Sequence, residues 1–232
     1  MSSVAENVRR VRDVIEDAAV KAGRNPSKVR LMAVTKTVED DRILEAIEAG
    51  VDIIGENYVQ EGKRKVEKLG RRGVEWHLIG YLQSNKAKYA LKIFDMIHSV
   101  DRLSLAQEID RRAGAAGSVA KILVEVNLSG EATKGGVKKD EALALVRDIA
   151  KLENLSVRGL MTMPPWFDDP EEARPYFAAL RELKDRVIDE KIGNVLMEEL
   201  SMGMTGDYRV AVEEGSTIVR VGRGIFGERP SR

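Results

Sequence analysis

The segment VRLMAVTKT, residues 29–37, is an apolar run that ends beside a lysine, Lys36. A short apolar run of this kind is typical of a strand buried in a parallel sheet. Similar runs recur along the chain, and amphipathic stretches separate them. We expect strands at Val29–Thr37, Val51–Glu56, Glu75–Tyr81, Met96–Val100, Lys121–Asn127, Val157–Thr162, Leu196–Ser201 and Ile218–Gly222.

The intervening stretches carry apolar residues at three- and four-residue spacing, which predicts helices. After one helix over residues 3–22, they cover Asp40–Glu48, Val59–Leu69, Asn85–Lys92, Arg102–Ala113, Lys139–Leu152, Pro170–Glu190 and Asp207–Glu214. Alternation of strand and helix implies right-handed crossovers and parallel strands, and eight such units close best as a barrel. We therefore predict a single α/β domain over residues 1–232, a (β/α)8 TIM-type barrel. Its extra amino-terminal helix would cover the gap left by a missing last helix.

An open, doubly wound sheet is the alternative architecture for the same alternation of elements. Its dinucleotide-binding form requires a Gly-x-Gly-x-x-Gly turn after the first strand. The sequence after Thr37 contains no such turn. The pattern therefore favours the closed barrel.

The composition narrows the function classes. Lysine and arginine number 38, as do aspartate and glutamate, so no net charge favours nucleic acid or an anionic membrane. The absence of cysteine excludes disulfides, thiolate chemistry and cysteine-ligated metals. The amino terminus has no apolar leader, and no apolar run reaches the length of a membrane span. We expect a cytoplasmic protein in which any anion site is local.

Side chains at the carboxyl ends of barrel strands converge on one mouth. Lys36 is expected there, beside Asn57, Asn85 and Asn127 at the ends of other strands. A partly desolvated mouth lowers the pKa of a lysine, and a neutral amine can form a Schiff base with a carbonyl compound. The alternative for Lys36 is a solvated lysine at a strand end.

The last two strands are followed by glycine-containing loops. Loops in this position of a barrel commonly bind phosphate through backbone N–H groups and the start of a short helix. Gly203, Gly222 and Gly224 would allow close approach of a ligand, Ser201 offers a hydroxyl, and Thr205–Asp207 would cap the next helix. Ordinary turns are the alternative. With a lysine at the mouth, the loops predict a covalently held, phosphorylated aldehyde.

Arg220 alternates with Gly222 along the last strand, so both are expected to face the barrel interior. A buried guanidinium requires a partner. That partner would be a ligand or, alternatively, a carboxylate such as Glu56 in an internal salt bridge.

The two histidines of the chain, His77 and His98, have no second ligand at metal-binding spacing. We expect no metal site. His77 follows Trp76 within an apolar strand, and we interpret it as a hydrogen-bonded histidine of the barrel.

Several segments together resemble the pyridoxal phosphate homeostasis protein family. They recur in the family's order along nearly the whole chain and are jointly specific: Ala33–Thr37, Gly55–Glu61, Trp76–Lys86, Gly159–Met163, Leu200–Asp207 and Val219–Gly227. The family resembles the barrel domain of alanine racemase, and its members bind pyridoxal 5′-phosphate without an established catalytic reaction. The resemblance therefore implies an alanine racemase-like barrel that binds this cofactor.

The resemblance also implies roles for individual residues. Lys36 would form the Schiff base, Asn57 would lie beside the cofactor ring, and Arg220 would face the pyridine nitrogen. The phosphate would be surrounded by Ser201, Gly203, Gly222, Arg223 and Gly224. Family members often carry serine or threonine where this chain has Arg223, so a hydroxyl donor is lost. The guanidinium would either replace it with charge-assisted hydrogen bonds or turn to solvent.

An arginine at the pyridine nitrogen keeps that nitrogen unprotonated and weakens the cofactor as an electron sink. Racemases of similar fold use a second acid/base group supplied with help from another domain, which we do not expect here. We predict a monomeric, non-catalytic carrier or reservoir in vitamin B6 homeostasis, with apo pyridoxal phosphate enzymes as recipients. The alternatives are an amino-acid racemase that uses Lys36 with Tyr58 or His77, and an aldolase in which Lys36 attacks a sugar phosphate.

Overall fold

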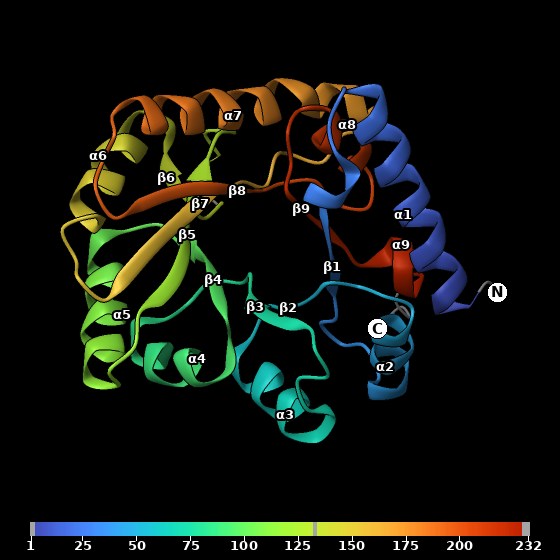
Figure 1. The fold of residues 1–232 in the computed structure, drawn as a ribbon, viewed down its shortest axis with the longest axis horizontal. Helices are drawn as coiled ribbons and strands as arrows, with labels where there is room; N and C mark the ends of the chain where they lie inside the picture. Colours follow the sequence, from blue (N-terminus) through green and yellow to red (C-terminus); the bar gives the residue numbers. More distant parts are fainter. Residues whose placement is uncertain (1–2, 132–133, 229–232) are drawn as a thin grey trace.

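The computed structural model describes residues 3–131 and 134–228. Within these ranges, eight parallel strands form a closed barrel in the order β4-β3-β2-β1-β9-β8-β7-β5, and pairing of β4 with β5 completes the ring (Figure 1). The strands are β1 (Arg30–Val34), β2 (Ile53–Glu56), β3 (Glu75–Leu78), β4 (Met96–Val100), β5 (Ala120–Asn127), β7 (Leu155–Met161), β8 (Val195–Ser201) and β9 (Ile218–Val221). The predicted barrel and each predicted barrel strand are confirmed.

The helices surround the barrel (Figure 1). They are α1 (Val4–Lys21), α2 (Asp40–Glu48), α3 (Val59–Leu69), α4 (Ala87–Ile93), α5 (Leu103–Ala115), α6 (Lys139–Ile149), α7 (Arg174–Asp189), α8 (Tyr208–Glu213) and α9 (Arg223–Phe226). Short 3-10 turns at Pro26–Lys28, Ser84–Lys86 and Pro170–Ala173 lead into β1, α4 and α7. The sequence pattern did not predict α9 or the two-residue strand β6 (Val137–Lys138), because neither is long enough to show a period.

Helix α1 lies along the outside of the ring, in contact with α8, α9 and α2 (Figure 1). A capping box between Ser3 and Glu6 starts it, and its apolar face is buried. The buried amide of Asn7 donates a hydrogen bond to the carbonyl of Ile225 in α9, at 2.8 Å. Helix α1 thus covers the barrel between the last and first βα units, as predicted.

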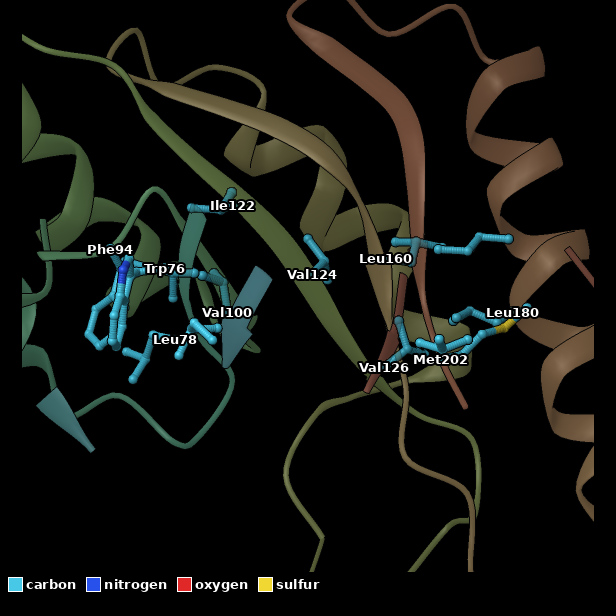
Figure 2. Packing of buried hydrophobic residues seen from close by; sticks show 14 of the residues in the cluster. Trp76, Leu78, Phe94, Val100, Ile122, Val124, Val126, Leu160, Leu180 and Met202 are labelled. Atoms are coloured by element: carbon cyan, nitrogen blue, oxygen red, sulfur yellow. The ribbon is translucent and has the colours of Figure 1, made fainter. Parts of the chain in front are cut away.

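The main core is the apolar layer between the strands and the helices. Figure 2 shows part of this layer, with Trp76, Leu78 and Phe94 near one strand pair and Leu160, Leu180 and Met202 between strands and α7. Each of these side chains is at most 6% exposed. Burial of one such side chain stabilises the fold by about 1.5–3 kcal/mol.

None of the helices in the described ranges combines the length and the apolar character that a membrane span requires.

A buried ion pair lies between β2 and α3, directly behind the loop that carries Lys36. The fully buried ammonium of Lys65 donates to Glu56 Oε1 at 2.7 Å, to Glu61 Oε1 at 2.7 Å and to the Thr35 carbonyl at 2.6 Å. The Thr35 hydroxyl also donates to Glu56. Burial raises the pKa of Glu56, and Lys65 opposes that shift. The pair therefore ties the end of β1 to α3.

We expect Lys65→Met to lower the free energy of unfolding by about 3–5 kcal/mol, because it leaves the Glu56 carboxylate buried without its cation. Urea denaturation measures this change. The matched control is Lys63→Met, which removes an exposed i,i+4 pair with Glu67 and should change stability by less than about 0.5 kcal/mol. Equal effects of the two substitutions would contradict the assigned role of Lys65.

Candidate functional site

A cavity of about 560 Å³ opens at the carboxyl ends of the barrel strands. Of the residues predicted to bind a ligand, those that line it are Lys36, Asn57, Arg220, Gly222 and Arg223. They follow or belong to β1, β2 and β9, so parallel pairing of these three strands brings them together. Exposed side chains of Tyr81, Met163 and Trp166 stand at the rim of the same cavity.

Lys36 occupies the turn between β1 and α2, and neighbouring contacts hold that turn in place. Thr35 on one side is tied to Lys65, and the Thr37 backbone N–H on the other donates to Glu61 Oε1 at 2.8 Å. Thr37 has a φ of 62°, a conformation that costs energy for a β-branched residue. The half-buried Lys36 side chain is therefore presented to the cavity from a fixed turn.

Asn57 lies at the end of β2 and lines the cavity. Its Oδ1 atom is buried and accepts no hydrogen bond from any described residue. The backbone of Asn57 also packs against Gly80, where an added Cβ would lie 2.2 Å from the Asn57 carbonyl oxygen. A buried polar atom without a partner costs about 1–3 kcal/mol, so Asn57 is suited to a ligand that supplies the missing hydrogen bond.

Arg220 forms part of the cavity wall and is 4% exposed. Its guanidinium donates to Ser201 Oγ and to the Thr162 carbonyl, each at 2.8 Å. Burial lowers the pKa of Arg220 to about 10, while the charges of Asp207 and Glu125 oppose the shift. Arg220 therefore stays cationic at neutral pH.

The predicted alternative, a salt bridge between Arg220 and Glu56, is wrong. Glu56 points away from the barrel interior and pairs with Lys65 of α3. The expectation that Asn85 and Asn127 lie beside Lys36 at the mouth is also wrong. Asn85 lies in a 3-10 turn outside the cavity lining, and the Asn127 side chain bonds its own loop, donating to the Glu131 carbonyl at 2.9 Å.

A chain of hydrogen bonds runs from Arg220 down the barrel interior. Ser201 Oγ lies 3.0 Å from His98 Nδ1, His98 Nε2 lies 2.9 Å from His77 Nδ1, and His77 Nε2 lies 2.8 Å from Glu75 Oε2. Burial lowers the pKa of both histidines, so both are neutral at pH 7. A neutral imidazole has one donor and one acceptor, so the chain donates in one direction, from Arg220 to Glu75.

This series of hydrogen bonds fixes the role of Ser201. Its oxygen accepts from Arg220 and its proton goes to His98, so the hydroxyl positions the guanidinium from beneath the cavity. Ser201 is not part of the cavity lining, and a phosphate contact for it stays a prediction. The interpretation of His77 as a hydrogen-bonded barrel histidine is confirmed. Within the described ranges, no three His, Asp or Glu side chains are arranged to hold a metal ion.

Backbone N–H groups gather where the loops after β8 and β9 meet. Among the described residues, those of Thr205, Gly206 and Arg223 donate no hydrogen bond, and all three residues line the cavity. Asp207 is the N-cap of α8, but its side chain accepts from Met204 N at 2.6 Å and bonds no N–H of the helix. The prediction that Asp207 caps this helix with its side chain is therefore wrong. Asp207 closes the loop instead, and the N–H groups of Thr205 and Gly206 are available to an anion.

The remaining predicted phosphate residues have other contacts. Gly203 has a φ of 93°, and an added Cβ would lie 2.5 Å from the Cβ of Ala211 in α8. Gly224 lies behind the lining, and an added Cβ would come within 2.8 Å of Val221. The Arg223 guanidinium is 53% exposed and lies 3.6 Å from the Glu228 carboxylate. Packing explains both glycines, and their phosphate contacts stay predictions.

Glu125 is a residue of the cavity that the sequence analysis missed. It lies on β5, lines the cavity and is 6% exposed. Burial and the nearby charge of Asp101 raise its pKa to about 7. A glutamate inside the apolar run ILVEVN was the available signal, because adjacent valines occupy the opposite face of the strand.

Comparison with known proteins identifies relatives of similar length. The family model described as alanine racemase, N-terminal domain, matches residues 1–230. The pyridoxal phosphate homeostasis protein of Aquifex aeolicus is 45% identical over 227 residues, which cover 98% of this chain and 99% of that protein. A crystal structure of an unknown protein from Bifidobacterium adolescentis is 42% identical, with a TM-score of 0.92 over 96% of this chain and 94% of its own. PipY of Synechococcus elongatus, in a structure with PLP bound, is 35% identical, with a TM-score of 0.85 over 97% of this chain and 100% of its own.

We expect Glu125→Gln to stabilise the protein at pH 8 by about 1–3 kcal/mol, because it removes a buried charge. A carboxyl whose pKa is raised on folding makes the folded state lose stability as the pH rises from about 4.5 to about 7. The gain in the variant should therefore shrink below pH 7 and vanish near pH 4. Urea denaturation across this range measures it. Glu141→Gln, at an exposed position, is the control and should show no such trend.

Proposed function

The chain belongs to the pyridoxal phosphate homeostasis protein family, and from that membership we propose that it binds pyridoxal 5′-phosphate through a Schiff base on Lys36. The observation that carries the proposal is the meeting of three features in one cavity. These are a lysine in a fixed turn, the cationic Arg220, and a group of backbone N–H donors that bond no residue within the described ranges. An aldehyde, a ring nitrogen and a phosphate are the corresponding groups of the cofactor.

The residues present fit that cofactor. Lys36 supplies the amine, and the guanidinium of Arg220 would donate to the pyridine nitrogen and keep it unprotonated. The loop residues Thr205 and Gly206, with Gly222 and Arg223 at the start of α9, would surround the phosphate. Bound cofactor supplies an electron sink, and the cationic Arg220 would weaken it.

We infer a carrier or reservoir of the cofactor in place of an enzyme. The curated relatives have names that describe homeostasis and not a reaction. The groups considered as the second base of a racemase are badly positioned for it, since Tyr58 is 65% exposed and His77 is bonded on both ring nitrogens below the cavity. The proposal treats the barrel as one domain that acts as a cytoplasmic monomer and loads apo enzymes.

We expect Lys36→Ala to abolish the Schiff-base absorbance of protein incubated with pyridoxal phosphate. Lys63→Ala, at an exposed position of α3, is the matched control and should keep it. Borohydride reduction followed by peptide mapping should place the cofactor on Lys36. A label found mainly on another lysine would contradict the assignment.

Because Lys36→Ala cannot form the Schiff base, the same variant tests whether the loops after β8 and β9 bind phosphate. Lys36→Ala should still retain pyridoxal phosphate more tightly than unphosphorylated pyridoxal, because the backbone donors and Arg223 are unchanged. Equilibrium dialysis of both compounds measures the difference. Equal retention would argue against a phosphate site in these loops.

We expect cofactor-loaded protein to show negligible racemisation of alanine or serine and negligible Cα exchange in deuterated water. Arg220 would weaken the electron sink, and neither Tyr58 nor His77, the two candidates for a second base, lines the cavity. Apo acceptor enzymes mixed with the loaded protein should gain activity. Chiral chromatography and NMR measure the first result. Turnover on the order of one per second or faster would favour the racemase alternative.

A further inference from the structure

Glu125 is a mostly buried residue at the ligand cavity, and its carboxyl has no partner among the residues that the structure describes. Val124 and Val126 belong to the outer apolar layer shown in Figure 2, so Glu125 between them points to the inner face of β5. It lines the cavity, is 6% exposed, and forms no hydrogen bond or ion pair with any described residue. Gly135 leaves room for it, because a Cβ there would lie 3.3 Å from Glu125 Oε1.

The groups around Glu125 do not neutralise an ionised carboxylate. Asp101, after the neighbouring strand β4, is an acid that adds repulsion and is itself paired with Arg102 at 2.6 Å. On the β7 side the register partner is Met161, which carries no charge. Lys134, in the loop after β5, pairs with Glu131 at 3.0 Å.

The two cations across the cavity, Arg220 and Lys36, do not pair directly with Glu125. Arg220 attracts Glu125, but its hydrogen bonds are directed to Ser201 and Thr162, and Asp207 also draws on its charge. Lys36 lines the same cavity, and a Schiff base would occupy its amine. An ionised Glu125 thus depends on cavity water for solvation in the free protein.

Ligand binding removes that water and brings negative charge. A phosphorylated ligand that fills the cavity would lie against the Glu125 carboxyl, and two anions in a desolvated site repel each other strongly. Protonation removes the repulsion and turns the carboxyl into an O–H donor, which no other titratable group of the inner face of β5 provides. One proton taken from solvent and placed on a Glu125 oxygen balances the change.

We propose that Glu125 binds the cofactor as a neutral carboxylic acid that donates its O–H to the ligand, so that binding takes up one proton from solvent. This inference rests on the proposed function. It makes Glu125 a binding residue that selects for ligands with an acceptor at this side of the cavity. It also makes cofactor retention weaken as the pH rises.

The test uses pyridoxine 5′-phosphate, which has no aldehyde and cannot react with Lys36. Its affinity for the wild-type protein and for Glu125→Gln is measured by calorimetry between pH 6 and 9. The ratio of the two affinities cancels the titration of the ligand. The wild type should lose affinity relative to the variant by up to about tenfold per pH unit above pH 7. The control Glu141→Gln should follow the wild type.

A second measurement needs no variant. Titration of the wild type at pH 8 in two buffers with different ionisation enthalpies counts the protons bound, and we expect close to one more than in Glu125→Gln. Parallel affinity curves, or no proton uptake by the wild type, would overturn the role of Glu125 and leave the proposed function standing. Failure of all these proteins to bind either the probe or pyridoxal phosphate would instead overturn the proposed function.

Discussion

Closure of parallel strands into a ring is the constraint on which the rest of this structure depends. Pairing of β4 with β5 completes the ring, so the carboxyl ends of all the barrel strands described here meet at one mouth (Figure 1). Arg220 lies far along the chain from Lys36 and Asn57, yet the three residues share one cavity because β2, β1 and β9 are neighbours in the ring.

The ring also creates an interior that side chains have to fill, and any polar group buried there has to be hydrogen-bonded. Here the filling is partly polar, and each buried polar group needs a partner. The chain from Arg220 through Ser201, His98 and His77 to Glu75 meets this need with one consistent direction of donation. Because both histidines are neutral, they place no positive charge next to the guanidinium, and Arg220 keeps its charge and its place in the cavity wall.

The site combines rigid supports with groups left without partners. The Lys65 pair supports the turn that carries Lys36, and the hydrogen-bonded chain supports Arg220. In contrast, Asn57 Oδ1 and the Glu125 carboxyl form no hydrogen bond with any residue that the structure describes. A buried polar group without a partner lowers the stability of the free protein, and a ligand that bonded it would recover that free energy.

The sequence by itself determined the barrel, its strands, most of its helices and the position of Lys36, because periodicity and strand-end position are local properties of the chain. It also placed Asn57, Arg220 and Gly222 at the mouth. Only the tertiary structure decided the partners: that Glu56 pairs with Lys65, that Ser201 accepts from Arg220, and that Glu125 lies in the same cavity as Arg220. Those outcomes depend on side-chain direction across strands distant in sequence, and no local pattern encodes which buried polar groups meet.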